Sequence, residues 1–202
     1  VTEPGRIIKE KLKPIVHDFE KSFLVEAFNR ILIDEQIPQN FTRGLISFVP
    51  KGDLEPFAMS KFLGHNAMHA LLGYLARNQG ISYMHEVGTR NDLMEIVRRS
   101  FIEEAGVGLR KKYFQVEDTL FTEDGFRDYA ERSLVRMVNP FLRDSVARVT
   151  RDPVRKLGWD DRLLGSMRLA LQAGVQPRIL AQAAAIALRI ACEENNWASR
   201  EY

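Results

Sequence analysis

Several residue classes are scarce in this sequence of 202 residues, and each scarcity excludes a class of protein. Cys192 is the one cysteine, so an internal disulfide and a cysteine-rich metal site are both excluded. No apolar run approaches the roughly 18 residues of a membrane span, and the polar segment from Val1 to Gly5 lacks the apolar core of a signal peptide. The formal net charge is only +2, which gives no electrostatic reason to expect nucleic acid or a membrane as partner. We therefore expect a cytoplasmic globular protein.

The motifs that hold phosphates and metals are also absent. No G-x-G-x-x-G follows a predicted strand, and the sequence has no Walker loop, no H-E-x-x-H and no G-x-S-x-G elbow. Gly106 and Gly108 lie inside a helical pattern, where we interpret them as close-packing or kink positions. We expect no bound metal. If the chain acts with a redox cofactor, the part that binds the cofactor phosphates must come from elsewhere.

The apolar pattern predicts a mainly α fold with a few short N-terminal strands. Apolar runs at 23–26, 30–33 and 45–49 could be strands, although residues 16–34 could equally form a helix. From Leu54 onward the spacing is helical, and we predict that helices start near Asn91, Thr122, Asp152 and Asp160. We therefore divide the chain into residues 1–50, with the short strands, and a helical domain over residues 51–202.

The densest group of polar side chains lies in residues 60–69 and contains Lys61, Asn66 and His69. On a continuous α-helix Lys61 and His69 would be about 80° apart, and Asn66 would be about 140° from Lys61. A bend at Gly64 would let the three groups converge. These residue types suit the oxidation of an alcohol, because a lysine can accept the hydroxyl proton and an amide can stabilise the alkoxide. Caps and surface groups of a helix have the same composition, so both interpretations stay open.

A second polar group, residues 139–157, interleaves five basic side chains with two aspartates. It includes Arg148 and Lys156, which could clamp an anion or a polyol, because arginine offers forked donors and lysine a point charge. The alternative is an ion-paired surface, for example Arg143 or Arg148 with Asp144.

Both groups resemble the mannitol dehydrogenase family of long-chain, polyol-specific dehydrogenases. Its pattern K-x4-N-x2-H matches Lys61, Asn66 and His69. Its later pattern N-P-x-L-x-D-x-x-x-R-V-x-R-x-P-x-R-K-L matches residues 139–157 at every specified position. The alanine-rich last helix is also similar, so the resemblance covers nearly the whole chain.

The resemblance implies the substrate-binding half of an NAD-dependent enzyme, with NADP as an alternative cofactor. A Rossmann domain outside this chain would bind that cofactor, and this half would fold like the helical domain of 6-phosphogluconate dehydrogenase. By position, Lys61 would be the general base, Asn66 an oxyanion-stabilising amide and His69 a contact to a substrate hydroxyl. Arg148 and Lys156 would contact the far end of a polyol, a polyol phosphate or a sugar acid. We expect the chain alone to be inactive.

Two other functions compete with this one. The absence of a cofactor loop and the alanine-rich helix also suit a non-catalytic helical module for interaction or oligomerisation. Such a module would ignore polyols and would leave Lys61 exposed. Nucleic-acid binding through the arginine-rich stretch is disfavoured, because the total charge is near neutral and no known motif is present.

Overall fold

A computed structural model describes residues 30–36 and 47–195 of the chain. The chain divides into two compact units, residues 1–55 and 56–202, which are described separately. Among the described residues, no helix is both long and apolar enough to cross a membrane.

The first unit contains two short parallel strands, β1 (Ile31–Asp34) and β2 (Phe48–Lys51). Their register pairs Ile31 with Phe48 and Asp34 with Lys51. Two of the three apolar runs are therefore strands, displaced by a few residues from the prediction, and a helix through residues 31–34 is excluded. The run at 23–26 lies outside the described residues.

The second unit is helical, which confirms the mainly α prediction. Its α-helices and π-helices in chain order are α2 (Glu55–Met59), the π-helix η1 (Ser60–His65), α3 (Asn66–Asn78), α4 (Met84–Val87), α5 (Asn91–Arg99), the π-helix η2 (Ser100–Ala105) and α6 (Gly106–Lys112). The 3₁₀ turn η3 (Thr119–Phe121), α7 (Glu123–Met137), the 3₁₀ turn η4 (Pro140–Leu142), α8 (Val146–Thr150), α9 (Pro153–Lys156), α10 (Arg162–Gln172) and α11 (Arg178–Glu194) follow.

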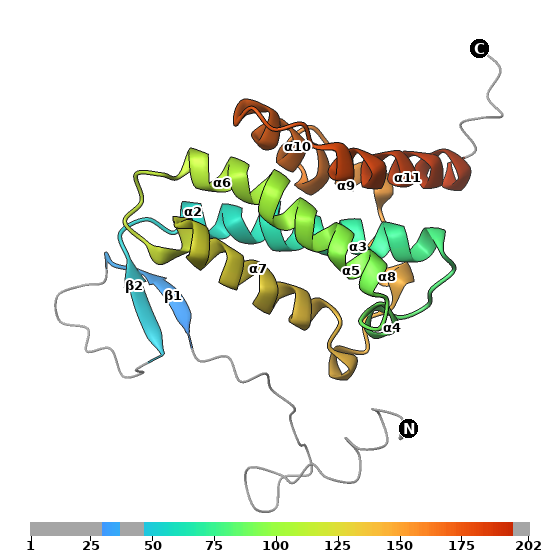
Figure 1. Ribbon diagram of the computed structural model, residues 1–202, viewed down its shortest axis with the longest axis horizontal. Helices are drawn as coiled ribbons and strands as arrows, with labels where there is room; N and C mark the ends of the chain where they lie inside the picture. Colours follow the sequence, from blue (N-terminus) through green and yellow to red (C-terminus); the bar gives the residue numbers. More distant parts are fainter. Residues whose placement is uncertain (1–29, 37–46, 196–202) are drawn as a thin grey trace, which may run out of the picture. The chain divides into compact units, whose positions relative to one another are not determined.

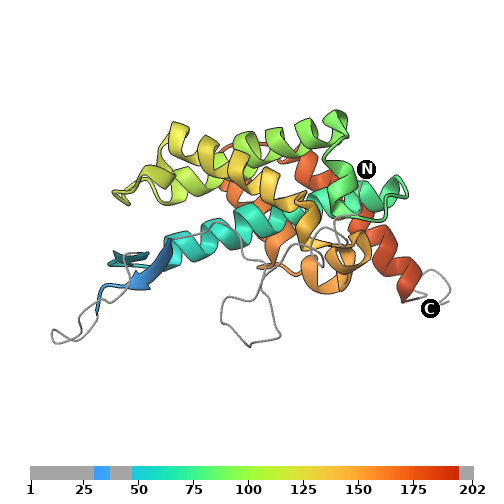
Figure 2. The same ribbon diagram turned by 90° about the horizontal axis from the view of Figure 1, so that it is seen from below.

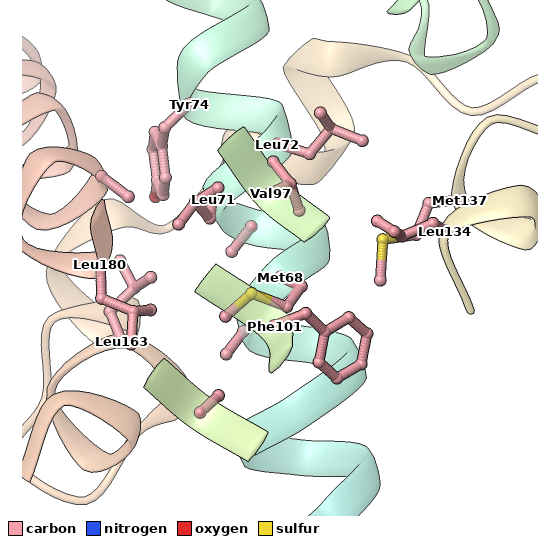
Figure 3. Packing of buried hydrophobic residues seen from close by; sticks show 14 of the residues in the cluster. Met68, Leu71, Leu72, Tyr74, Val97, Phe101, Leu134, Met137, Leu163 and Leu180 are labelled. Atoms are coloured by element: carbon pink, nitrogen blue, oxygen red, sulfur yellow. The ribbon is translucent and has the colours of Figure 1, made fainter. Parts of the chain in front are cut away.

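Helix α3 is the centre of the helical unit. It packs against α5, α8, α10 and α11. Figure 1 shows α9, α10 and α11 on one side of it and α7 on the other, with α5 and α6 running alongside. Buried side chains cover α3 on all sides, as expected for a helix with neighbours all round. In Figure 3 Met68 and Leu71 of α3 lie between Phe101 of η2 and the pair Leu163 and Leu180.

Glycines allow the closest of these helix contacts. A Cβ at Gly106 would lie 2.6 Å from the ring of Phe126, and one at Gly108 would lie 2.9 Å from the backbone of Leu169. Both distances are shorter than real Cβ contacts, so the glycines are required for α6 to pack against α7 and α10. This confirms the close-packing interpretation of Gly106 and Gly108.

Several predicted helix starts need correction. Thr122 does cap α7, because its Oγ1 accepts from the N–H of Gly125 at 3.1 Å. Asn91 is instead the first residue of α5, and Asp161 rather than Asp160 caps α10. Asp152 precedes α9 as predicted, but its backbone is left-handed, with φ of 55°, and its side chain makes no cap hydrogen bond. A left-handed backbone turns the side chain away from the first turn, which is why this cap fails.

Candidate active site

The helical run that carries Lys61, Asn66 and His69 contains a π-helix rather than a break. Helices α2, η1 and α3 follow one another without a gap from Glu55 to Asn78, as Figure 2 shows. The helical run therefore has no break at Gly64, where the sequence allowed one. Gly64 is buried against η2 instead, and a Cβ there would lie 3.1 Å from Cε2 of Phe101. A side chain at this position would push the two helical segments apart.

The π-helix changes which side chains share a face. The backbone N–H of Asn66 donates to the carbonyl of Lys61, five residues earlier. A hydrogen bond from i+5 to i closes one turn of a π-helix. Lys61 and Asn66 therefore lie one turn apart on the same side of the helix, where α-helical geometry would separate them by about 140°. His69 follows on α3, one turn beyond Asn66.

Positive charge gathers around η1. Burial, together with the charges of His69, Arg136 and Lys61, lowers the pKa of His65 from 6.5 to about 4. The rings of His65 and His69 lie 6.1 Å apart. His65 is therefore neutral near pH 7, and its neighbours supply the charge. Lys61 is exposed, so the described residues do not give it the burial expected of a lysine base.

His69 faces a buried carboxylate that belongs to the second polar group. Its Nε2 lies 3.3 Å from Oδ2 of Asp144, whose side chain is only 6% exposed. Arg148 holds the same carboxylate with two hydrogen bonds, from Nε to Oδ1 at 2.6 Å and from Nη2 to Oδ2 at 2.5 Å. Burial alone would raise the pKa of Asp144, but the contacts with His69 and Arg148 outweigh it and lower the pKa to about 2. Asp144 is therefore ionised at neutral pH.

The backbone around Asp144 is held on both sides. Its carbonyl accepts from the N–H of Met84 at 2.9 Å, within an antiparallel bridge between Tyr83 and Ser145. The preceding residue, Arg143, is left-handed with φ of 50°. A left-handed non-glycine residue costs on the order of 1–3 kcal/mol and persists only where its surroundings impose it. The fold therefore fixes the backbone that carries the carboxylate.

Helix α8 brings Arg148 to this carboxylate because α8 packs unusually close to α3. A Cβ at Gly73 of α3 would lie 2.5 Å from Cγ1 of Val149 on α8. The hydroxyl of Tyr74 also donates to the carbonyl of Thr150 at 3.3 Å. Gly73 lies one turn after His69, so the contact that it permits determines how near Arg148 comes to His69.

Lys156, the last of the predicted site residues, has different surroundings. It is 4% exposed, and its Nζ donates to the carbonyl of Arg151. Burial first, then the charges of Arg162 and Arg155, lower the pKa of Lys156 from 10.5 to about 8. The structure thus joins His69 to Arg148 through Asp144 and aligns Lys61 with Asn66, but it shows no contact from Lys156 to either group.

The ion pair of Arg148 with Asp144, one of the alternatives from sequence, is present in the structure. What the sequence did not predict is that Asp144 is buried and also contacts His69. Its signal was its position four residues before Arg148, at the spacing of an ion pair within one helical turn. That spacing gives no indication of burial, which here comes from the packing of α8 on α3.

The described connection after strand β2 carries no glycine-rich phosphate turn. Parallel strand β2 leads into α2 through Lys51-Gly52-Asp53, which holds a single glycine rather than a glycine-rich phosphate turn. Within the same residues no three histidine, cysteine or acidic side chains gather as a metal site would require. The polar groups of the site offer the donors and acceptors that suit a polar substrate.

Known proteins match this chain over most of its length. The family described as the mannitol dehydrogenase C-terminal domain matches residues 53–201. A mannitol-1-phosphate 5-dehydrogenase of Caldanaerobacter subterraneus is 32% identical over 152 residues, which is 74% of this chain and 38% of the relative. The enzyme of that name from Thermoanaerobacter pseudethanolicus is 34% identical, over 63% of this chain and 31% of the relative. The one from Bacillus licheniformis is 29% identical, over 92% of this chain and 48% of the relative.

The matched region is thus less than half the length of each of these relatives. Every predicted site residue lies inside the region that the family matches. The helical architecture, the two polar groups and the match together identify the chain as a member of the mannitol dehydrogenase C-terminal domain family.

Proposed function

We propose that this chain is the substrate-binding and catalytic half of an NAD(P)-dependent polyol dehydrogenase, which oxidises a secondary alcohol to a ketone. The observation that carries the proposal is the π-helix η1, which aligns Lys61 with Asn66 one turn before His69. π-helical turns are rare and occur often at functional sites. The relatives named above are all called mannitol-1-phosphate 5-dehydrogenases, which supports a polyol phosphate as substrate.

Each residue has a role at a stated atom. Nζ of Lys61 accepts the proton of the reacting hydroxyl, and the side-chain amide of Asn66 donates to the oxygen as negative charge develops there. His69 and Arg148 hold neighbouring hydroxyls or the phosphate, for which the forked donors of arginine are well suited. Lys156 contacts the far end of the substrate only if its Nζ leaves the carbonyl of Arg151.

The rest of the active site would come from a Rossmann domain outside this chain. A nicotinamide bound there would supply the acceptor for the hydride that leaves the substrate carbon. That domain would also cover Lys61 and exclude water from it, which the described residues do not do. A reducing compartment such as the cytoplasm suits a chain with a single cysteine.

The test is NADH or NADPH formation by the full-length protein with a panel of polyols, polyol phosphates and sugar acids, beside the 202-residue chain alone. We expect turnover by the full-length protein only. Lys61→Ala should then lower kcat by about 10²- to 10⁴-fold, the usual contribution of a general base. Normal oxidation by Lys61→Ala would show that another group accepts the proton.

A non-catalytic interaction module is the second candidate, and the exposure of Lys61 agrees with it. Leu171 and Leu188 are also half exposed on α10 and α11. Thermal shift of the 202-residue chain with polyol phosphate separates the two functions, because a ligand that binds the native state raises its apparent stability. A rise in Tm supports the enzyme half. An unchanged Tm together with oligomerisation supports the module.

A further inference from the structure

The carboxylate of Asp144 is much less exposed than the two side chains that contact it. It is 6% exposed, whereas the side chain of Arg148 is 60% exposed and that of His69 is 21% exposed. A group so buried cannot itself be the main contact for a substrate that arrives from solvent. It can, however, act through the two exposed groups that it holds.

The ring nitrogen of His69 that faces Asp144 is closed to solvent. Nε2 is buried and lies 3.3 Å from Oδ2 of Asp144. Nε2 makes no well-formed hydrogen bond in the structure. A substrate hydroxyl therefore meets the other ring nitrogen, Nδ1. With the proton on Nε2, toward the carboxylate, Nδ1 of a neutral imidazole is an acceptor.

Arg148 is fixed in the same way. Its Nε and Nη2 both donate to Asp144, which orients the plane of the guanidinium and leaves Nη1 without a bond to that carboxylate. Bidentate pairs of this kind are the strong, directional form of a charged hydrogen bond. The bridge at Tyr83 and Ser145 and the left-handed Arg143 keep the carboxylate itself in place.

We propose that Asp144 is a positioning residue, which holds His69 and Arg148 toward the substrate so that Nδ1 of His69 and Nη1 of Arg148 contact it. This inference rests on the proposed function, because the substrate is the polyol or polyol phosphate of that reaction. It adds a buried residue that acts only through its two neighbours, and it assigns the contacting atoms.

The first experiment measures Asp144→Asn in the full-length enzyme. The change keeps the size of the side chain but removes the charge that binds Arg148. We expect the KM for the polyol substrate to rise by about 10-fold or more, the scale of one charged hydrogen bond. The KM for the cofactor should not change. Glu131→Gln is the matched control, because Glu131 binds Arg98 through the same two-oxygen geometry outside the site.

The second experiment asks whether Asp144 acts through its neighbours. In a background of His69→Ala with Arg148→Ala, adding Asp144→Asn should change kcat/KM by less than about twofold, because mutations that remove one shared interaction are not additive. His69→Asn and His69→Gln then test which ring nitrogen of His69 contacts the substrate. The asparagine amide reaches the position of Nδ1, and the glutamine amide reaches that of Nε2, so His69→Asn should retain the lower KM.

A third readout does not depend on activity. In ¹H–¹⁵N spectra of the 202-residue chain, the Nε–H of Arg148 should give a distinct, slowly exchanging peak that is lost in Asp144→Asn. An unchanged polyol KM in Asp144→Asn overturns the positioning role. So does a variant in which kcat and Tm both fall while the polyol KM stays the same. A lower KM for His69→Gln than for His69→Asn overturns the assignment of Nδ1. If the wild-type enzyme oxidises no polyol, it is the proposed function that fails.

Discussion

The two π-helices of the described residues share a backbone pattern but differ in which side chains they expose and bury. η1 and η2 each have six residues, each begins with a buried serine, and each ends in a hydrogen bond from i+5 to i. The second position of η1 is the exposed Lys61, and that of η2 is the fully buried Phe101. The two segments touch, since Phe101 fills the space beside Gly64. The same type of backbone thus presents a polar side chain to solvent in η1 and places an aromatic side chain in the core in η2.

The fifth positions differ as well. Gly64 of η1 has no side chain, whereas Glu104 of η2 carries a buried carboxylate. Glu104 accepts from the hydroxyl of Ser100 at 2.8 Å and from the N–H groups of Ile179 and Leu180 at 2.8 and 3.0 Å. It therefore caps α11 from a distant part of the chain. Under the proposed function η1 serves catalysis and η2 serves stability, and four substitutions test that division.

The largest effect is expected at the end of η1. Asn66→Ala in the full-length enzyme should lower kcat by about 10²- to 10³-fold, as for the loss of one oxyanion donor. The Tm of the helical domain should change little, because the side chain of Asn66 is only partly buried. A variant that keeps its kcat and loses Tm would assign Asn66 to structure instead. Steady-state kinetics and a thermal melt of the same sample decide.

Glu104→Gln should have the opposite profile. Loss of charged hydrogen bonds to the first turn of α11 should lower the free energy of unfolding by about 2–3 kcal/mol. The adjacent Glu103 is the matched control, because it is exposed and pairs with Arg99 only at 3.5 Å. Glu103→Gln should stay within about 0.5 kcal/mol of wild type. Denaturant unfolding compares the two, and equal values would refute the capping role of Glu104.

Gly64→Ala tests the contact between the two π-helices. The new methyl group would lie 3.1 Å from Cε2 of Phe101 and 3.4 Å from Cδ1 of Leu109. Such overpacking costs about 1–3 kcal/mol, partly offset by the better helix propensity of alanine. Phe101→Leu in the same chain should restore part of the loss by making room. Additive losses in the double variant would show that the two positions do not share this contact.

The fourth substitution tests acid stability at His65. Its pKa is about 4 in the folded chain and 6.5 as the ordinary value, so between these pH values the unfolded chain binds more protons. The free energy of unfolding therefore rises as pH increases from 4 to 6.5. His65→Gln should flatten this part of the curve. Asp144, whose pKa is lowered from 3.8 to about 2 in the folded chain, adds a slope of the same sign at the acid end of this range. A slope that persists in His65→Gln would assign it to another group.

Periodicity predicted most of the helical unit, because burial of one face repeats along each helix. It could not predict η1 or η2, since the extra residue of a π turn leaves no local signature and the contact between Gly64 and Phe101 joins distant segments. The angle predicted between Lys61 and Asn66 was wrong for this reason. The boundary at residue 50 stays a prediction beside the division at Glu55 and Pro56.

The site residues were named from their spacing and their resemblance to a family, and their roles stay predictions. What spacing could not supply was the link between the two polar groups, because His69 and Asp144 meet only after α8 packs on α3. The burial of Lys156 was also not predicted, since its exposed neighbours Arg155 and Arg151 suggested a surface.

The left-handed Arg143 bears on how this protein can be engineered. Glycine at that position would remove the energetic cost of the left-handed backbone, which is on the order of 1–2 kcal/mol for an L-residue. It would thus be attractive to anyone seeking a more heat-resistant enzyme. The same glycine would widen the range of conformations open to the neighbouring Asp144, and with it the spread of orientations of His69 and Arg148. Arg143 is thus a position where thermostability and substrate affinity pull in opposite directions.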